Sequence, residues 1–207
     1  MKRVACFIDG FNMYHAIDNR FATCYKWCNY RALINGYLQD DEQLDRVLYF
    51  SAFARWDTGK VARHNMFIKA LSHHGIEVIM GKFKKKKPFC KKCSQRYTTH
   101  EEKESDVNIA IHMVSMAYED DFDTALLVSG DSDFVSTIQF LKEKFDRKKF
   151  GVIVPGNLQF ANDLRNVAHF SKHVDFEHIK TSRLPDEITL EDGTLIKCPP
   201  EYLIPGS

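Results

Sequence analysis

The 207-residue sequence has no long apolar run, no low-complexity linker and no internal repeat. Without about 20 consecutive apolar residues, we expect no membrane-spanning helix and no membrane partner. The first apolar run ends at Asp9, too early for a signal peptide, and no cleavage site follows it. Six cysteines without an export signal favour free thiols in a reducing compartment. We therefore expect a cytoplasmic protein of one domain with small additions.

The chain also has almost no net charge, +1 from 29 basic and 28 acidic residues. The charge is nevertheless unevenly distributed. Residues 82–97 contain eight basic residues and no acid, which leaves 21 basic against 28 acidic residues in the rest of the chain. The pattern predicts a mostly acidic body that carries one basic segment.

Short apolar runs rich in β-forming residues alternate with segments of helical period. The expected strands are residues 3–8, 46–53, 76–80, 124–128 and 150–154. The expected helices are 12–17, 30–38, 57–74, 105–118, 131–145 and 158–167. In the 105–118 helix, the expected core stripe is Val107, Ala110, Ile111, Val114 and Tyr118. Strands that are apolar on both faces predict a three-layer α/β/α sandwich around a mostly parallel sheet.

Two segments lie outside this alternation. Residues 82–100 fit neither period and are predicted to form a basic insertion in a domain that spans residues 1–180. Residues 181–207 are predicted to form a C-terminal extension with a β-hairpin, because Asp192-Gly193 lies between two short apolar runs.

Acidic residues occur where two of the predicted strands end. Asp9 follows the first strand, Asp131 follows the fourth, and Asp133 lies two residues later. Asp106 opens the preceding helix, and Asn12 lies one turn from Asp9. Ligands of parallel sheets bind beyond the carboxyl ends of the strands, so these residues predict one acidic pocket. Clustered carboxylates repel one another, and a hard divalent cation such as Mg²⁺ or Mn²⁺ relieves that repulsion.

Each acid alone has a simpler interpretation. Asp133, Ser132 and Asp106 are ordinary residues for a helix start, and Asp9-Gly10 is an ordinary turn. It is their convergence at one sheet edge that favours a site.

Three blocks of the sequence resemble the signature of the NYN domain, in the LabA-like branch of the PIN-like nuclease superfamily. They are residues 7–14 (FIDGFNMY), 102–110 (EKESDVNIA) and 127–134 (LVSGDSDF), and the resemblance extends over about residues 3–175. It implies a PIN-like fold and a metal-dependent endoribonuclease that hydrolyses RNA phosphodiesters with Mg²⁺ or Mn²⁺.

The same resemblance implies roles for individual residues. Asp9, Asp106 and Asp131 are the implied metal ligands, and Asp133 would bind metal or position water. Asn12, Ser129 and Ser132 would orient a carboxylate or the substrate. The chain departs from the family where it reads Ala168-His169-Phe170, because many members carry an acid in this slot.

The basic segment offers two further interpretations. Phosphate contacts to single-stranded RNA are expected from Lys84, Lys85, Lys86, Lys87, Lys91, Lys92 and Arg96, although a lysine run is also typical of a solvated face. Phe83, Phe89 and Tyr97 are suited to stacking on unpaired bases. Cys90 and Cys93 have the spacing of half a structural zinc site, which His100, the pair Cys24 and Cys28, or a second copy in a homodimer would complete. Two surface thiols without metal are the alternative.

Other functions are weighed against the nuclease. A non-catalytic module that binds RNA or a protein partner would use the same fold with the acids in structural roles. A phosphatase of the haloacid dehalogenase type needs a second Asp two residues after the first, where this chain has Phe11. A dinucleotide-binding domain needs G-x-G-x-x-G after a strand, which the sequence lacks.

Overall fold

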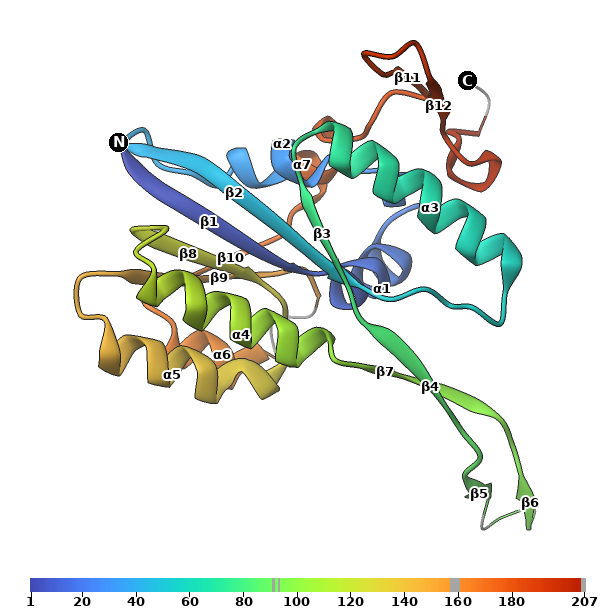
Figure 1. Ribbon diagram of the computed structural model, residues 1–207, viewed down its shortest axis with the longest axis horizontal. Helices are drawn as coiled ribbons and strands as arrows, with labels where there is room; N and C mark the ends of the chain where they lie inside the picture. The colour runs from blue at the N-terminus through green and yellow to red at the C-terminus, as the bar shows by residue number, and fades with distance from the viewer. Residues whose placement is uncertain (91, 93, 157–160, 206–207) are drawn as a thin grey trace.

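The computed structural model describes residues 1–90, 92, 94–156 and 161–205, and six strands form one sheet in it (Figure 1). These are β1 (Lys2–Asp9), β2 (Glu42–Ser51), β3 (Glu77–Met80), β8 (Thr124–Val128), β9 (Lys149–Val154) and β10 (Phe170–His173). Their order is β10-β9-β8-β1-β2-β3, and every neighbouring pair is parallel. The predicted parallel α/β architecture is confirmed, and β10 is a strand that was not expected from the sequence.

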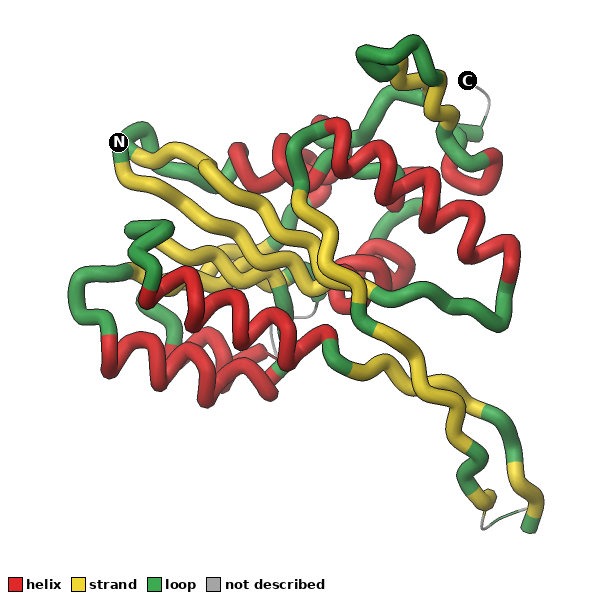
Figure 2. The backbone as a smooth tube through the Cα atoms, viewed as in Figure 1, coloured by secondary structure: helices red, strands yellow, loops and turns green. Residues whose placement is uncertain are grey.

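Helices cover both faces of this sheet (Figures 1 and 2). One layer contains α1 (Gly10–Arg20), α2 (Tyr30–Asn35), α3 (Thr58–His73) and α7 (Phe176–Thr181), and the other contains α4 (Ser105–Tyr118), α5 (Val135–Lys144) and α6 (Asn162–Val167). Successive β1 side chains point to opposite faces. Cys6 and Ile8 therefore pack in the first core cluster, whereas Ala5 and Phe7 pack in the second.

Helix α3 begins and ends where the sequence predicts. The Asp57 side chain accepts a hydrogen bond from the Lys60 N–H at 2.9 Å, which satisfies one of the free donors of the first turn. His74 is the C-cap, and Gly75 follows with a φ of 71°, in the left-handed region that suits glycine.

The expected core stripe of α4 is wrong. Val107, Ile111 and Tyr118 are exposed, while Ile109, Met113, Met116 and Ala117 are buried against the sheet. The helix is apolar on nearly all sides, so two stripes of helical period compete, and packing rather than periodicity selects one. The predicted helix 158–167 is observed as α6 from Asn162, and residues 158–160 lie outside the described residues.

The insertion is a β-ribbon rather than an irregular excursion. β4 (Lys82–Lys86) pairs with β7 (Thr99–Lys103), and β5 (Phe89–Cys90) pairs with β6 (Gln95–Arg96) at the tip. We call residues 82–103 the arm, which projects away from the body (Figure 1). Ion pairs stabilise its base, because Glu101 on β7 contacts Lys86 and Lys103, and Glu104 contacts Lys82.

The C-terminal residues form the predicted hairpin from β11 (Glu187–Thr189) and β12 (Leu195–Lys197). Ile188 and Ile196 pack in the same core cluster as α3. The division into residues 1–180 and 181–207 stays a prediction. Within the described ranges, every helix is too short or too polar to span a lipid bilayer.

Candidate metal centre

Asp9 is the last residue of β1 and is only 5% exposed. Its carboxylate accepts hydrogen bonds from the Asn12 N–H at 3.0 Å and from the Ser129 Oγ at 2.9 Å. One contact caps α1 and the other crosses to the loop after β8. The strand end, the helix start and the neighbouring loop therefore fix the position of Asp9 together.

The loop after β8 positions Asp131. The Ser129 Oγ accepts a hydrogen bond from the Asp131 N–H at 3.1 Å, and an Asp131 oxygen accepts one from the Asp133 N–H at 3.0 Å. The Asn12 Oδ1 accepts one from the Gly130 N–H at 3.1 Å. Asp131 thereby caps the short 3-10 helix η2 (Ser132–Phe134), the first turn before α5. Ser132 is exposed on that turn, and its role toward substrate stays a prediction.

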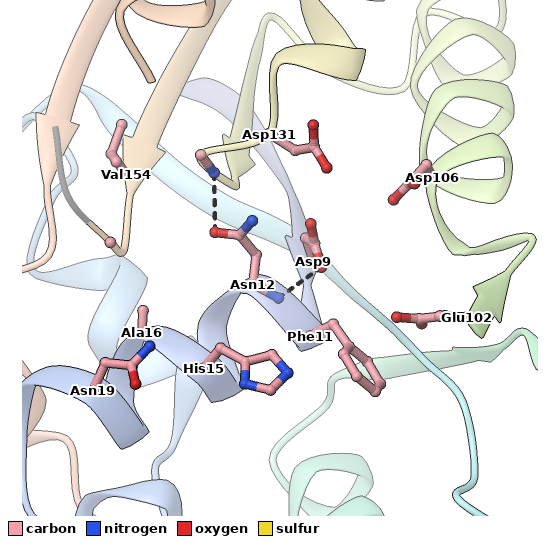
Figure 3. A pocket seen from close by; sticks show the side chains of 12 residues that line it. Asp9, Phe11, Asn12, His15, Ala16, Asn19, Glu102, Asp106, Asp131 and Val154 are labelled. Atoms are coloured by element: carbon pink, nitrogen blue, oxygen red, sulfur yellow. Dashed lines mark hydrogen bonds between the residues drawn. The ribbon is translucent and has the colours of Figure 1, made fainter. Parts of the chain in front are cut away.

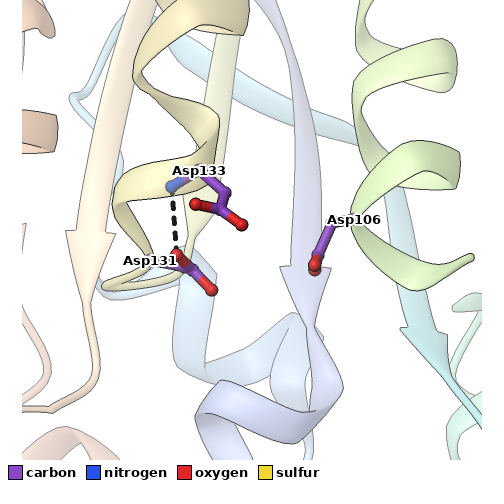
Figure 4. A group of neighbouring side chains, drawn as sticks. All are labelled: Asp106, Asp131 and Asp133. Carbon is purple, nitrogen blue, oxygen red and sulfur yellow. Dashed lines mark hydrogen bonds between the residues drawn. The ribbon is translucent and has the colours of Figure 1, made fainter. Parts of the chain in front are cut away.

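Three carboxylates converge across the gap between α4 and η2 (Figure 4). One oxygen each from Asp106, Asp131 and Asp133 lies within 4.8 Å of the others. Oxygen ligands in this arrangement suit a hard divalent cation. Sequence reasoning placed Asp106 only through a helix start, and the structure brings it to the same edge as Asp131.

Asp106 and Asp131 also border a pocket of about 390 Å³ (Figure 3). Asp9, Asp106 and Asp131 line it together with Glu102, so we call it the acidic pocket. Sequence reasoning did not single out Glu102 as a site residue. Glu102 lies on β7, and only the pairing of β7 with β4 brings this base of the arm to the sheet edge.

Comparison with known proteins identifies the fold and the family. Residues 3–176, which make up most of the chain, match the NYN domain. The chain belongs to the NYN domain family. This family is part of the PIN-like nuclease superfamily.

Two known proteins are similar to this NYN protein at low sequence identity. One is a 6-hydroxy-3-succinoylpyridine 3-monooxygenase of Pseudomonas putida, 25% identical over 88% of this chain and 70% of the relative. The other is the crystal structure of a protein of unknown function from Vibrio parahaemolyticus. It superposes with a TM-score of 0.56 at 20% identity, over 84% of this chain and 93% of that one. At this identity the second likeness supports the fold alone.

Burial and mutual repulsion raise the pKa of three acids in the acidic pocket of this NYN protein. Burial raises the pKa of Asp9 to about 6, against the two hydrogen bonds that favour its ionised form. Burial likewise raises the pKa of Glu102 to about 7, with Asp9 and Asp106 adding repulsion. The pKa of Asp106 is raised by burial and by the nearby Asp131 and Asp133. When these acids are ionised, the pocket therefore favours the binding of a cation.

Asp9→Asn is expected to stabilise the metal-free NYN protein at pH 8 but not at pH 4. The pKa of Asp9 is higher in the folded state, so its ionisation lowers the free energy of unfolding as the pH rises through about 6. Relative to its effect at pH 4, the substitution should gain about 3 kcal/mol at pH 8. Urea unfolding at both pH values measures it. As a matched control, Asp123→Asn should destabilise at pH 8, because Arg3 lowers the pKa of Asp123. A pH-independent effect of Asp9→Asn would contradict the assigned burial.

The zinc prediction can be followed only in part. Cys93 and Lys91 lie outside the described residues, and so does the side chain of Cys90. His100 pairs with Lys85 near the base of the arm, whereas Cys90 pairs with Gln95 at its tip. His100 follows Gln95 by five residues, which span roughly 15 Å in an extended chain. His100 therefore does not fit as a zinc ligand beside Cys90. Cys24 and Cys28 are free thiols buried in the body.

The arm presents its lysines on two faces. Alternation along β4 places Lys85 on the same face as Phe83, whose ring contacts Phe11 of α1 at 5.2 Å between centroids. Lys84 and Lys86 point to the opposite face, where Lys86 contacts Glu101. Among the described lysines of β4, Lys85 therefore lies on the face turned toward the body. Lys87, Lys92 and Arg96 are exposed farther along the arm.

Lys85→Ala is expected to weaken binding of single-stranded RNA more than Lys84→Ala. A lost phosphate contact lowers the slope of log affinity against log salt by about 0.7 for single strands. We expect this change for Lys85→Ala and a smaller one for Lys84→Ala, both measured by fluorescence anisotropy at several salt concentrations without divalent ions. Equal slopes for the two variants would show that the arm acts as a diffuse charge instead.

Proposed function

We propose that this NYN protein is a divalent-metal-dependent endoribonuclease that hydrolyses phosphodiesters of unpaired RNA at the acidic pocket. The observation that carries the proposal is the convergence of Asp106, Asp131 and Asp133 within 4.8 Å at the carboxyl edge of the sheet. Membership of the PIN-like superfamily supports nuclease chemistry at the level of the superfamily. Within it, we assign the chain to the LabA-like branch on its three sequence blocks.

The donor set fits Mg²⁺ or Mn²⁺. All its groups are carboxylate oxygens, which these ions prefer, and two of the three acids remain exposed enough for water to complete the coordination. A bound ion would offset the repulsion among the acids and polarise a phosphoryl oxygen. Asp106, Asp131 and Asp133 are the residues that would hold it, and the buried Asp9 lines the acidic pocket together with Asp106 and Asp131.

The chain's own groups orient this site and handle its proton. Ser129 donates to Asp9 and accepts from the Asp131 N–H, so one side chain sets the positions of two acids. Glu102 accepts a hydrogen bond from the Ser105 Oγ and lines the acidic pocket, so its carboxylate is placed to act as a general base. In the proposed hydrolysis, water adds to phosphorus and its proton passes to a Glu102 oxygen. The bond between phosphorus and the 3′-oxygen breaks, and that oxygen takes a proton from a solvent water, so the products carry 3′-hydroxyl and 5′-phosphate ends.

The name of the Pseudomonas putida relative describes oxidation of a substituted pyridine. At 25% identity we do not extend that activity to this chain. The acids that converge here favour attack of water on phosphorus, because they can hold a cation next to a phosphodiester.

End-labelled single-stranded RNA, incubated with the full chain and Mn²⁺ or Mg²⁺, tests the proposal. We expect metal-dependent fragments with 5′-phosphate ends, none with chelator, and a duplex of the same sequence cut more slowly. Intact RNA that nevertheless binds the protein would support the non-catalytic RNA-binding alternative and overturn the enzymatic proposal.

A further inference from the structure

A second cavity, of about 260 Å³, adjoins the acidic pocket. Phe11 and His15, one turn apart on α1, line both. The other walls come from the end of β2 and the loop after it, from α3, from the arm and from Tyr202 near the C-terminus. Its volume is near the lower end of the range for small-ligand sites, roughly 300–1,000 Å³. We call it the aromatic cavity.

Rings dominate its walls where the arm meets the body. Trp56, in the loop before α3, stacks on His100 of β7 with ring centroids 3.6 Å apart and planes 6° apart. Phe83 of β4 meets Trp56 edge-on at 4.7 Å. Trp56 nevertheless remains 46% exposed. A planar ligand therefore meets a preformed aromatic platform. Few side chains must be ordered when it binds, which lowers the entropic cost of binding.

The charged groups in the walls of this cavity differ in sign from those of its neighbour. The described residues that line it include Lys26, Lys60 and Arg63 and no acid, whereas four acids line the acidic pocket. These three cations pair with Asp18, Asp57 and Glu201, which lie outside the lining. His64 of α3 adds a neutral ring at neutral pH, because burial lowers its pKa to about 4. An apolar platform with cations nearby suits a flat ring attached to a phosphate chain.

We propose that the aromatic cavity holds an unpaired nucleobase of the same RNA strand whose phosphodiester lies in the acidic pocket. This inference rests on the proposed function and deepens it. The wall shared through Phe11 and His15 places the two sites next to each other, so neighbouring nucleotides of one strand can occupy both. Such a base must be unstacked, which gives a physical reason for the preference for unpaired RNA.

The intrinsic fluorescence of Trp56 tests the proposal. The chain has two tryptophans, and Trp27 is fully buried, with its Nε1 donating to the Pro185 carbonyl at 2.8 Å. A single-stranded hexaadenylate is titrated into the full chain carrying Asp131→Asn, without added divalent ions, so that no strand is cut. We expect saturable quenching. An abasic strand of the same length and charge should bind about tenfold more weakly and quench little.

Two phenylalanines give matched variants. Phe83→Leu keeps apolar volume in the wall but removes the aromatic face, and it should weaken hexaadenylate binding by about fivefold. Phe140→Leu, on the exposed side of α5 and outside both pockets, should leave quenching and affinity unchanged. Circular dichroism verifies that both variants are folded. Equal quenching by the abasic strand, or equal loss in both variants, would overturn the proposal.

The outcome is separable from that of the nuclease proposal. If RNA is cleaved but the base-dependent quenching is missing, the cavity assignment fails and the nuclease stands. If quenching depends on the base but no condition yields cleavage, the cavity binds a nucleobase and the enzymatic proposal fails.

Discussion

Asp131→Asn is expected to lower kcat/KM for RNA cleavage by at least about a hundredfold. Asp131 belongs to the converging carboxylates and also lines the acidic pocket. Asparagine keeps the shape and an oxygen that can still accept from the Asp133 N–H, so the loop should persist while one negative ligand is lost. A metal stabilises the transition state by several kcal/mol, and each 1.36 kcal/mol corresponds to tenfold in rate.

Initial rates at several Mn²⁺ concentrations measure this effect, and calorimetric titration of Mn²⁺ measures the accompanying loss of affinity. Asp146→Asn is the matched control, because it removes an exposed acid after α5 that no ion pair involves among the described residues. It should leave both quantities unchanged. Undiminished cleavage by Asp131→Asn would show that the acidic pocket is not where RNA is cut.

Gly10→Ala is expected to lower the free energy of unfolding by about 3 kcal/mol and to weaken metal binding. Gly10 follows Asp9 directly and begins α1. A Cβ there would lie 2.5 Å from the Phe50 carbonyl oxygen and 2.6 Å from the ring of Tyr49. Tyr49 is buried and the carbonyl belongs to β2, so neither can yield cheaply. The start of α1 must shift, and Asp9 shifts with it.

Gly59→Ala provides the comparison for this variant. Its Cβ would meet its nearest neighbour at 3.4 Å, an ordinary contact, near the start of α3. Alanine is favoured over glycine in helices by up to about 1 kcal/mol, so stability should stay the same or rise. Thermal unfolding of both variants, with and without Mn²⁺, measures the contrast. A Gly10→Ala protein as stable as the wild type would contradict the close packing of α1 on β2.

The strands and most helices could be predicted because burial and local caps determine them. The Thr124–Val128 segment is apolar and β-forming, and it is observed as β8 with the same bounds. The start of α3 follows from Asp57 alone. The face of α4 could not be predicted, because Val107 and Ile111 are as apolar as Ile109 and Met113, and the choice between them is a tertiary one.

The residues of the candidate site likewise divide into those that the sequence could predict and those that it could not. Asp9 and Asp131 could be predicted from the rule that parallel strands end at one edge, and both line the pocket. Glu102 could not, and neither could the contacts of Phe83 and His100 with Trp56, because the register of β4 with β7 sets these positions. A lysine run gives no alternating apolar signal for that ribbon. Its ion pairs with Glu101 appear only once the two strands are paired.

Anomalous diffraction from crystals soaked in Mn²⁺ tests the central claim most directly. We expect a manganese peak among the carboxylates of Asp106, Asp131 and Asp133, with oxygens at about 2.1 Å, and its loss in Asp131→Asn crystals. A pocket without a peak at saturating Mn²⁺, or a peak that Asp131→Asn leaves unchanged, would contradict it.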